Sequence, residues 1–224
     1  MKQKRCDDPA QAVEPVFDGA SVMIGGFGRS GVPEALTDAI CESGVRGLTV
    51  ISNNSGTEET GIARLLMAGC VAKIVCSFPR ATESTVFKQR FDAGEVELEL
   101  VPQGTLAERI RTGGAGLGGF LTRTGVGTEL AAGKRELQVD GETYLLERPL
   151  RADFALVKAD RVDPRGNLTY RKAARNFNPV MATAAETVIV QAAREVALGA
   201  LEPEHVVTPG IYVDRYCIYS SPNA

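Results

Sequence analysis

The sequence predicts an α/β fold with three layers, α/β/α, built around a mainly parallel, doubly wound sheet. Short runs of β-branched residues alternate along the chain with segments of helical periodicity, which is the pattern of successive βαβ units. The chain has 224 residues, of which 44% are hydrophobic, so it can bury one sizeable core. Because no internal repeat or low-complexity linker divides it, we expect residues 1–224 to form a single domain.

Strands and helices are expected to alternate through the first half of the chain. Residues 22–24 are the first strand, and residues 33–43 form a helix that has Pro33 in its first turn. Further strands are expected over residues 48–52, 73–77 and 97–102, and further helices over residues 60–68, 83–93 and 105–113. The strand over 97–102 (ELELVP) alternates charged and apolar residues, so it is predicted to be the more exposed one.

A glycine-rich segment and a hairpin come before the last predicted strands. Residues 113–128 (GGAGLGGFLTRTGVGT) contain too much glycine for a helix or a regular strand and are too many for a minimal connection. We therefore predict a shaped, functional loop that includes Gly113, Gly114, Gly116, Gly118, Gly119 and Phe120. A small β-hairpin follows, because Asp140-Gly141 between ELQV and TYLLE favours a type I′ turn. Residues 154–159 and 186–192 are two further core strands.

Composition and charge exclude several classes of partner. The net charge is −3 and the charged residues are scattered singly, which gives no electrostatic footprint for nucleic acid or an anionic membrane. The basic N-terminus is not followed by an apolar segment, and no run approaches the ~20 apolar residues of a membrane span. We therefore expect a cytoplasmic protein with neither a nucleic-acid nor a membrane partner.

The cysteines and the histidine offer little for metal or nucleophilic chemistry. The five cysteines are odd in number and at least six residues apart, which indicates buried reduced thiols rather than a metal knuckle or a disulfide framework. His205 is the sole histidine and lies in a proline-rich segment, which indicates a surface or packing residue. No metal site is expected.

A glycine cluster follows the first predicted strand, at Gly25, Gly26, Phe27, Gly28, Arg29, Ser30 and Gly31. A strand that ends in glycines and leads into a helix aims backbone N–H groups and a helix dipole at one point, which suits a phosphate or a carboxylate. A dinucleotide fingerprint is one alternative, but Asn53-Asn54 stand where its acidic residue would end the second strand. A purely structural tight turn is another, whereas a P-loop is disfavoured because no Gly-Lys-Ser/Thr closes the segment.

Small and polar residues follow the other predicted strands. Asn53 and Asn54 follow the second strand, Ser77 the third and Gln103 the fourth. In a doubly wound sheet these strand ends form the edge at which ligands bind. Neutral amides there can donate hydrogen bonds to a carbonyl or an oxyanion, as acyl-transfer sites require. Ordinary turn or cap chemistry is the alternative explanation for each of them.

Long motifs in order along the chain resemble the A (alpha) subunit of family I coenzyme A-transferases. They are DGASVMIGGFGRSGVP, SNNSGTEETGI, PQGTLAERIRTGGAGLGGF, TGVGT, RADFALVKA, GNLTYRKAARNFNP and VVTPGIYVDR. The runs KIVCSFPR and TYRKAARNFNPVMA are most similar to the 3-oxoadipate branch of this family. The acetoacetate and short-chain acid branches are near relatives.

The resemblance implies a ping-pong transfer of CoA from succinyl-CoA, or another acyl-CoA, to a 3-oxo acid such as 3-oxoadipate. The CoA thioester is then a substrate, and no permanently bound cofactor is implied. In this family a glutamate attacks the acyl-CoA, gives a mixed anhydride and becomes an enzyme–CoA thioester. That glutamate lies in a Ser-Glu-Asn-Gly motif of the B subunit, whereas no such tetrapeptide occurs here. The chain is therefore expected to supply half of an active site, in an A2B2 heterotetramer.

The resemblance also implies roles for the residues singled out above. Asn53, Asn54 and Gln103 would support the thioester or the oxyanion, and residues 25–31 would form a loop that binds CoA or the substrate acid. The nucleophile is not expected at Glu58 or Glu59, which are interpreted as acids near a helix N-terminus.

Two residues depart from the family pattern. Arg123 and Val126 stand where the family often has a proline and an aromatic residue. Arg123 is a candidate for binding a substrate carboxylate, and an exposed, solvated arginine is the alternative. The second functional hypothesis is a module of the same fold that binds CoA or a sugar phosphate without transfer chemistry.

Overall fold

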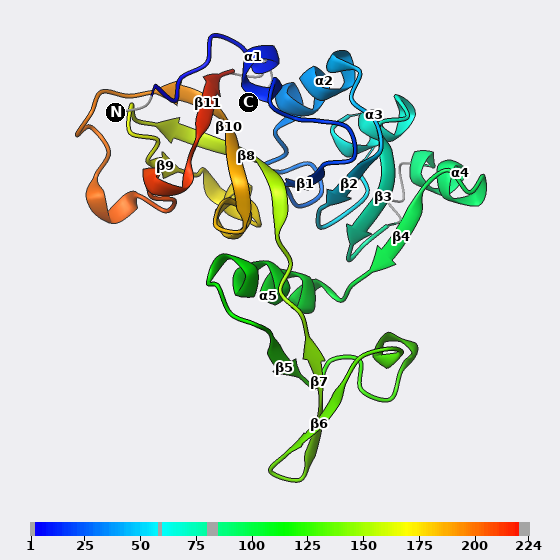
Figure 1. The fold of residues 1–224 in the computed structure, drawn as a ribbon. Helices are drawn as coiled ribbons and strands as arrows, with labels where there is room; N and C mark the ends of the chain where they lie inside the picture. Colours follow the sequence, from blue (N-terminus) through cyan, green and yellow to red (C-terminus); the bar gives the residue numbers. More distant parts are fainter. Residues whose placement is uncertain (1–2, 58–59, 80–84, 220–224) are drawn as a thin grey trace.

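A computed structural model describes residues 3–57, 60–79 and 85–219 of the chain. Its centre is a sheet whose described strands lie in the order β11-β10-β8-β1-β2-β3-β4, with the short β9 paired to β8 (Figure 1). Every pairing in this sheet is parallel except that of β8 with β9. The strands are β1 (Ser21–Ile24), β2 (Leu48–Ile51), β3 (Val71–Cys76), β4 (Glu97–Leu100), β8 (Ala152–Val162), β9 (Leu168–Thr169), β10 (Ala185–Glu195) and β11 (Arg215–Ile218).

The strand order reverses between β1 and β8, as the predicted doubly wound topology requires. From β1 the chain adds β2, β3 and β4 on one side, and β8, β10 and β11 complete the other side. β1 lies between β2 and β8 and runs parallel to both. The carboxyl end of β1 is therefore a topological switch point, where ligands bind in open α/β sheets.

Helices cover both faces of the sheet, and alternating side chains of β1 enter two separate cores. Val22 and Ile24 pack in one core, whereas Met23 packs in the other, because successive side chains of a strand point to opposite faces. The first core is covered by α1 (Pro9–Val13), α2 (Glu34–Ser43), α3 (Ile62–Met67) and α4 (Val86–Asp92). The second is covered by α5 (Gln103–Gly114) and α6 (Asn178–Ala182). The predicted three-layer α/β/α class is thus confirmed.

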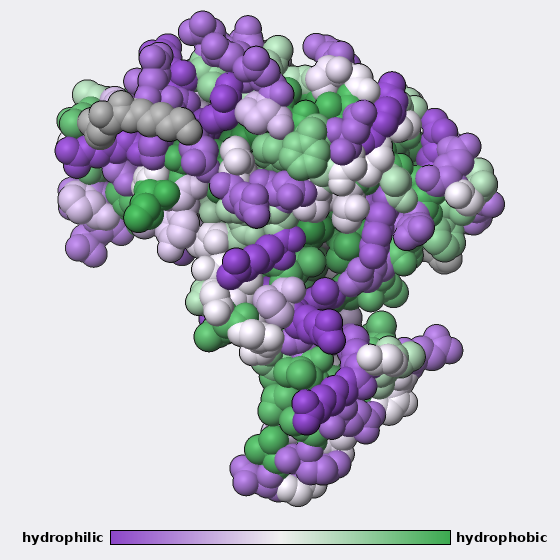
Figure 2. All heavy atoms as spheres, viewed as in Figure 1, coloured by the Kyte–Doolittle hydropathy of each residue, from purple (hydrophilic) through white to green (hydrophobic). Residues whose placement is uncertain are grey.

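A second, antiparallel sheet stands away from the main body (Figure 1). Its described strands are β5 (Phe120–Thr122), β6 (Glu136–Val139) and β7 (Glu142–Glu147), in the order β5-β7-β6. The predicted hairpin is confirmed, since Asp140 and Gly141 at its turn have φ values of 50° and 80°, as a type I′ turn requires. Leu121 and Val139 are each 39% exposed, and Figure 2 shows hydrophobic residues exposed along this sheet.

The glycine-rich segment 113–128 is not one continuous loop, so that part of the prediction is wrong. Gly113 and Gly114 are the last residues of α5, and Phe120–Thr122 is the strand β5. Close packing explains the two helical glycines. A Cβ on Gly113 would lie 2.2 Å from Leu150 O, and one on Gly114 would lie 2.1 Å from Thr183 Oγ1. Tertiary contacts therefore override the low helix propensity of glycine.

The other predicted elements are present with shifted ends. β8 and β10 extend beyond the expected 154–159 and 186–192, because the two strands pair with each other along most of their length. α3 and α4 are shorter than expected, and residues 83 and 84 of the predicted fourth helix lie outside the described residues. β4 is an edge strand with no buried residue, which confirms its predicted exposure.

Several short elements were not predicted because they carry too few residues to show a period. They are α1, α6, β9, β11 and the 3₁₀ helices Glu129–Ala131, Lys172–Arg175, Pro203–His205 and Gly210–Tyr212. Some of them are fixed by contacts distant in sequence. For example, Tyr216 of β11 donates its backbone N–H to Lys4 O near the N-terminus.

All five cysteines are free thiols, and four of them are buried, as predicted; Cys41 is half-buried. Burial raises the pKa of the Cys76 thiol to about 11, which keeps it protonated and unreactive. His205 is exposed, in agreement with its interpretation as a surface residue. In the described part of the chain, no helix is both long enough and apolar enough to cross a bilayer.

Candidate active site

The glycine cluster forms a tight hairpin-like turn at the carboxyl end of β1. Phe27 N donates to Ser30 O at 3.0 Å, and Ser30 N donates to Phe27 O at 3.1 Å. Gly28 takes the first central position with φ +57°, as in a type II′ turn. The turn presents Phe27, which is 50% exposed, toward the carboxyl edge of the sheet.

Two asparagines at the start of α6 hold this glycine loop in place: Asn176 lies just before the helix, and Asn178 is its first residue. Asn176 accepts from Gly26 N at 3.1 Å through Oδ1 and donates through Nδ2 to Ser30 O at 2.9 Å. Asn178 is fully buried and donates through Nδ2 to Gly31 O at 3.0 Å. The sequence alone does not indicate this role for either asparagine, because nothing local links RNFNP to a loop 150 residues earlier.

These asparagines explain part of the glycine content of the loop. A Cβ on Gly25 would lie 1.9 Å from Asn178 Oδ1, and one on Gly31 would lie 2.6 Å from Ala174 O. Side chains are therefore excluded at these two positions by the protein itself. Gly28 is different, because a Cβ there would meet nothing within 4 Å. Within the loop, Gly28 is the glycine that remains open to a ligand.

The amides predicted at the next strand ends converge beside the glycine loop. Gln103, the first residue of α5, donates through Nε2 to Asn53 Oδ1 at 2.8 Å. Ser77 Oγ donates to the same Oδ1 at 2.8 Å. The Oδ1 of Asn53 thus accepts two hydrogen bonds, while its Nδ2 makes none with the described residues. The two bonds to Oδ1 fix the orientation of the Asn53 carboxamide at the end of β2.

Asn54 has a partly structural role. Its Oδ1 accepts from Gly56 N at 2.8 Å, which is the Asx-turn that the sequence left open as an alternative. Its backbone forms a bridge with Phe78, so the ends of β2 and β3 stay paired beyond the regular strands. Asn54 therefore shapes the end of β2 whether or not it also contacts a ligand.

A cavity of about 440 Å³ lies where these residues meet. It is lined by residues that follow β1, β2, β3 and β4, namely Phe27, Gly28, Asn53, Asn54, Thr57, Ser77, Phe78 and Gln103. Phe78 is 57% exposed and stands at the rim with Phe27. None of these lining residues carries a carboxylate or an imidazole. Glu58 and Glu59 lie outside the described residues.

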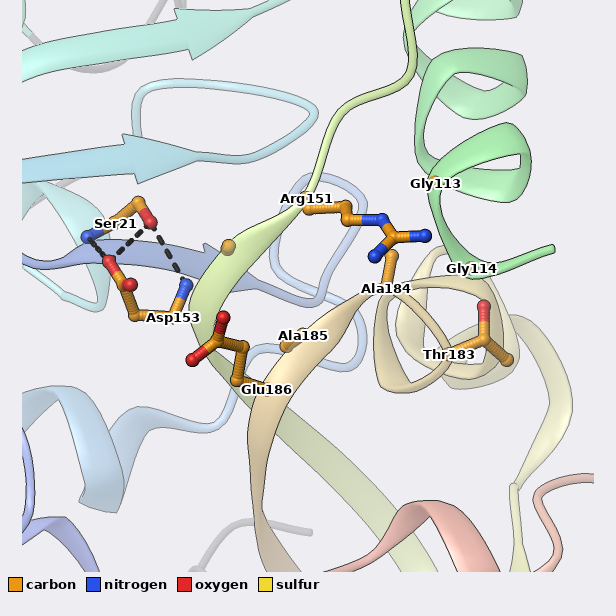
Figure 3. A pocket seen from close by; sticks show the side chains of 10 residues that line it. Ser21, Gly113, Gly114, Arg151, Asp153, Thr183, Ala184, Ala185 and Glu186 are labelled. Carbon is orange, nitrogen blue, oxygen red and sulfur yellow. Dashed lines mark hydrogen bonds between the residues drawn. The ribbon is translucent and has the colours of Figure 1, made fainter. Parts of the chain in front are cut away.

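The glycine-rich segment after α5 lies elsewhere. Gly113 and Gly114 line a separate cavity at the amino ends of β1, β8 and β10, together with Arg151, Asp153 and Glu186 (Figure 3). Hydrogen bonds from the Ser21 hydroxyl and backbone N–H hold the pKa of Asp153 below its usual range. This cavity is therefore on the edge of the sheet opposite the converging amides.

The remaining predicted residues belong to the outlying sheet and to the segment that connects α5 to it. Gly116, Gly118 and Gly119 lead from α5 to Phe120, the first residue of β5. Arg123 Nη2 lies 3.0 Å from Glu142 Oε2, and both side chains are largely exposed. The structure therefore gives Arg123 a surface ion pair on the outlying sheet, and Arg123 does not line the cavity beside the glycine loop.

Comparisons with known proteins agree with one family. Residues 6–216 match the model of the family described as coenzyme A transferase. The whole chain is 54% identical to the A subunit of 3-oxoadipate CoA-transferase from Pseudomonas putida, of which it covers 97%. It is 50% identical, over 90% of each chain, to the alpha subunit of acetate CoA-transferase from Escherichia coli K12. The fold matches glutaconate coenzyme A-transferase of Acidaminococcus fermentans with a TM-score of 0.86 at 18% identity, covering 97% of this chain and 76% of that one.

The close approach of Asn178 to Gly25 predicts the effect of a single added methyl group. Gly25→Ala should lower the free energy of unfolding by about 1–3 kcal/mol, because the Cβ must displace a buried, hydrogen-bonded carboxamide. Gly118→Ala is the matched control, since a Cβ there meets nothing within 4 Å, and its effect should stay within about 0.5 kcal/mol. Urea unfolding measures both; equal stability of the two variants would contradict the proposed contact.

Proposed function

This chain belongs to the coenzyme A transferase family, and from that premise we propose that it is the A subunit of an enzyme that transfers CoA to a 3-oxo acid. The proposed donor is succinyl-CoA or another acyl-CoA, and the proposed acceptor is 3-oxoadipate. The acceptor is supported by 54% identity over the whole chain to the A subunit of a protein named 3-oxoadipate CoA-transferase. Acetoacetate or a short-chain acid is the alternative acceptor, which the 50% identity to the alpha subunit of an acetate CoA-transferase supports.

The observation that carries this proposal is the lining of the cavity beside the glycine loop. Its described residues include three neutral amides, and none of them has a carboxylate. Transfer begins when a glutamate carboxylate attacks the thioester carbonyl, the C–S bond breaks, and a mixed anhydride and CoA thiolate result. The thiolate then attacks the glutamyl carbonyl, which releases the first acid and leaves an enzyme–CoA thioester. The second acid repeats these steps in reverse. We propose that the glutamate comes from a partner B subunit, as the resemblance to the family implies; this proposal is supported by the described residues of the lining, none of which is a glutamate.

The contribution of this chain is then to stabilise the negative charge that develops on the acyl oxygen. Asn53 is the central donor, because Ser77 and Gln103 occupy its Oδ1 and fix the orientation of its Nδ2. Donors that are already oriented need no reorganisation when charge develops, which is why such groups lower the barrier. Gly28 leaves the backbone of the glycine loop open to the acyl group or to the pantetheine arm of CoA.

An assembled enzyme is supported by apolar side chains that the chain leaves exposed. Phe27 and Phe78 stand at the rim of the cavity, and Leu121 and Val139 lie on the outlying sheet. We propose that the partner covers the aromatic pair, delivers its glutamate and keeps water away from the anhydride. Two such pairs would form an A2B2 heterotetramer, in which residues 1–224 act as one domain.

A substrate panel with the reconstituted pair tests this function. The chain is mixed with succinyl-CoA and its purified partner, and the new thioesters are measured by mass spectrometry with 3-oxoadipate, acetoacetate or acetate as acceptor. The expected kcat/KM is highest for 3-oxoadipate, and the chain alone should transfer no CoA. A higher kcat/KM for acetate would contradict the acceptor, and transfer to none of the acids would contradict the function.

Replacing Gln103 by alanine should reduce turnover with little effect on stability. Loss of one preorganised donor typically costs a hundred- to a thousandfold in rate, or about 2.7–4 kcal/mol, and a donor that is no longer oriented is lost in the same way. Gln103→Ala is therefore expected to lower kcat by roughly that factor, because Asn53 loses the hydrogen bond that orients it. Gln138→Ala, which removes an exposed side-chain hydrogen bond on β6, is the control. A change of less than about threefold in kcat/KM for Gln103→Ala would show that Gln103 only shapes a turn.

A further inference from the structure

A second cavity, of about 350 Å³, shares the glycine loop with the candidate active site. The loop contributes Ser30 and Gly31 to this cavity, whereas it contributes Phe27 and Gly28 to the first one. Four alanines and the charged residues Lys158, Asp160, Arg171 and Lys172 complete the lining. None of these charged residues has a role in the site described above.

The charges that line this cavity are unbalanced. Lys158, Arg171 and Lys172 carry three positive charges, and none of them forms an ion pair within the described part of the chain. The one carboxylate of the lining, Asp160, is already engaged: its Oδ2 lies 3.4 Å from Arg194 Nη2 and 3.6 Å from Arg161 Nε. By contrast, other basic residues are matched by acids, as Lys73 and Arg109 are by Glu99. The cavity therefore offers a positive charge that the described residues of the chain do not neutralise.

The two cavities are fixed relative to one another by the same asparagine. Asn178 accepts from Lys158 N at 2.9 Å and donates to Gly31 O at 3.0 Å, so it joins β8 to the glycine loop. Phe27 and Ser30 are directly paired across the loop, and such pairs have Cα atoms about 4.5–5.5 Å apart. One side of this narrow turn lines the amide cavity and the other lines the basic one.

We propose that the basic cavity binds the anionic end of a substrate whose reacting carbonyl lies in the amide cavity. This inference rests on the proposed function. Lysine and arginine in a hollow lined with alanine attract and bind oxyanions. The oxyanion has two possible sources on the substrates of such a reaction, namely the distal carboxylate of a dicarboxylic 3-oxo acid or the phosphates of CoA. From the sequence, Arg123 is the candidate for binding the carboxylate of a dicarboxylic acceptor. Arg123 is instead paired to Glu142 on the outlying sheet, and the basic cavity contains cations that can take this role.

The test uses the reconstituted enzyme with Lys158→Met and with the double variant Arg171→Ala/Lys172→Ala. Lys88→Met is the matched control, because Lys88 is an exposed lysine that pairs with Asp92 on α4. One arm compares 3-oxoadipate with acetoacetate at a fixed donor. The other compares succinyl-CoA with succinyl-pantetheine, which lacks the phosphates of the nucleotide end. Unfolding midpoints of all variants establish that they are folded.

Both cavity variants are expected to raise the KM of the anionic substrate at least tenfold, with kcat changed less than threefold. A rise for 3-oxoadipate but not for acetoacetate assigns the cavity to the carboxylate. A rise for succinyl-CoA but not for succinyl-pantetheine assigns it to the phosphates. An active wild-type enzyme whose variants keep every KM within twofold overturns this inference alone. A wild-type pair that transfers CoA to neither acid overturns the proposed function and the inference with it.

Discussion

The candidate site depends on one buried side chain, Asn178, which joins three segments at the point where the sheet reverses. Its Oδ1 accepts from Lys158 N of β8, and its Nδ2 donates to Gly31 O of the glycine loop and to Ala174 O of the preceding turn. A buried amide that makes all these bonds has few alternative positions, so it fixes the loop against the sheet. The glycines at 25 and 31 follow from this contact, because a Cβ at either position would enter the space that the asparagine or its turn occupies.

Because the glycine loop is fixed, its two sides can line two different cavities. On one side, the loop meets Asn53, Ser77 and Gln103, which form a small network of neutral amides and a hydroxyl. On the other side, it meets Lys158 of β8 and the two cations before α6, Arg171 and Lys172, which form no ion pair with any residue that the structure describes. Neutral donors suit a charge that appears only during reaction, whereas cations suit a charge that is permanent. In the proposed enzyme, this chain therefore positions and polarises a substrate, and its partner supplies the nucleophile.

The sequence predicts those features that depend on local patterns. The alternating runs predict the doubly wound sheet, and parallel strands share a carboxyl edge, so Asn53 and Gln103 could be expected to converge. The purpose of the glycines could not be predicted, because the partner of Gly25 is Asn178, which is distant in the sequence. The same reason explains why Gly113 and Gly114 were assigned to a loop: Leu150 and Thr183, which require them to be glycine, belong to other segments. The basic cavity could not be predicted either. In the sequence, Lys158 is a single charged residue within a core strand, and only the fold brings it to the same cavity as Arg171 and Lys172.

The central claim is that this chain provides half of an active site and that the covalent glutamate is on the partner. Peptide mapping tests it most directly: the reconstituted enzyme is incubated with acyl-CoA, the enzyme–CoA thioester is reduced with borohydride, and the modified residue is found by mass spectrometry. The account predicts a modified glutamate in the partner chain and none in residues 1–224 of this chain. A modified glutamate in this chain, including Glu58 or Glu59, would contradict it.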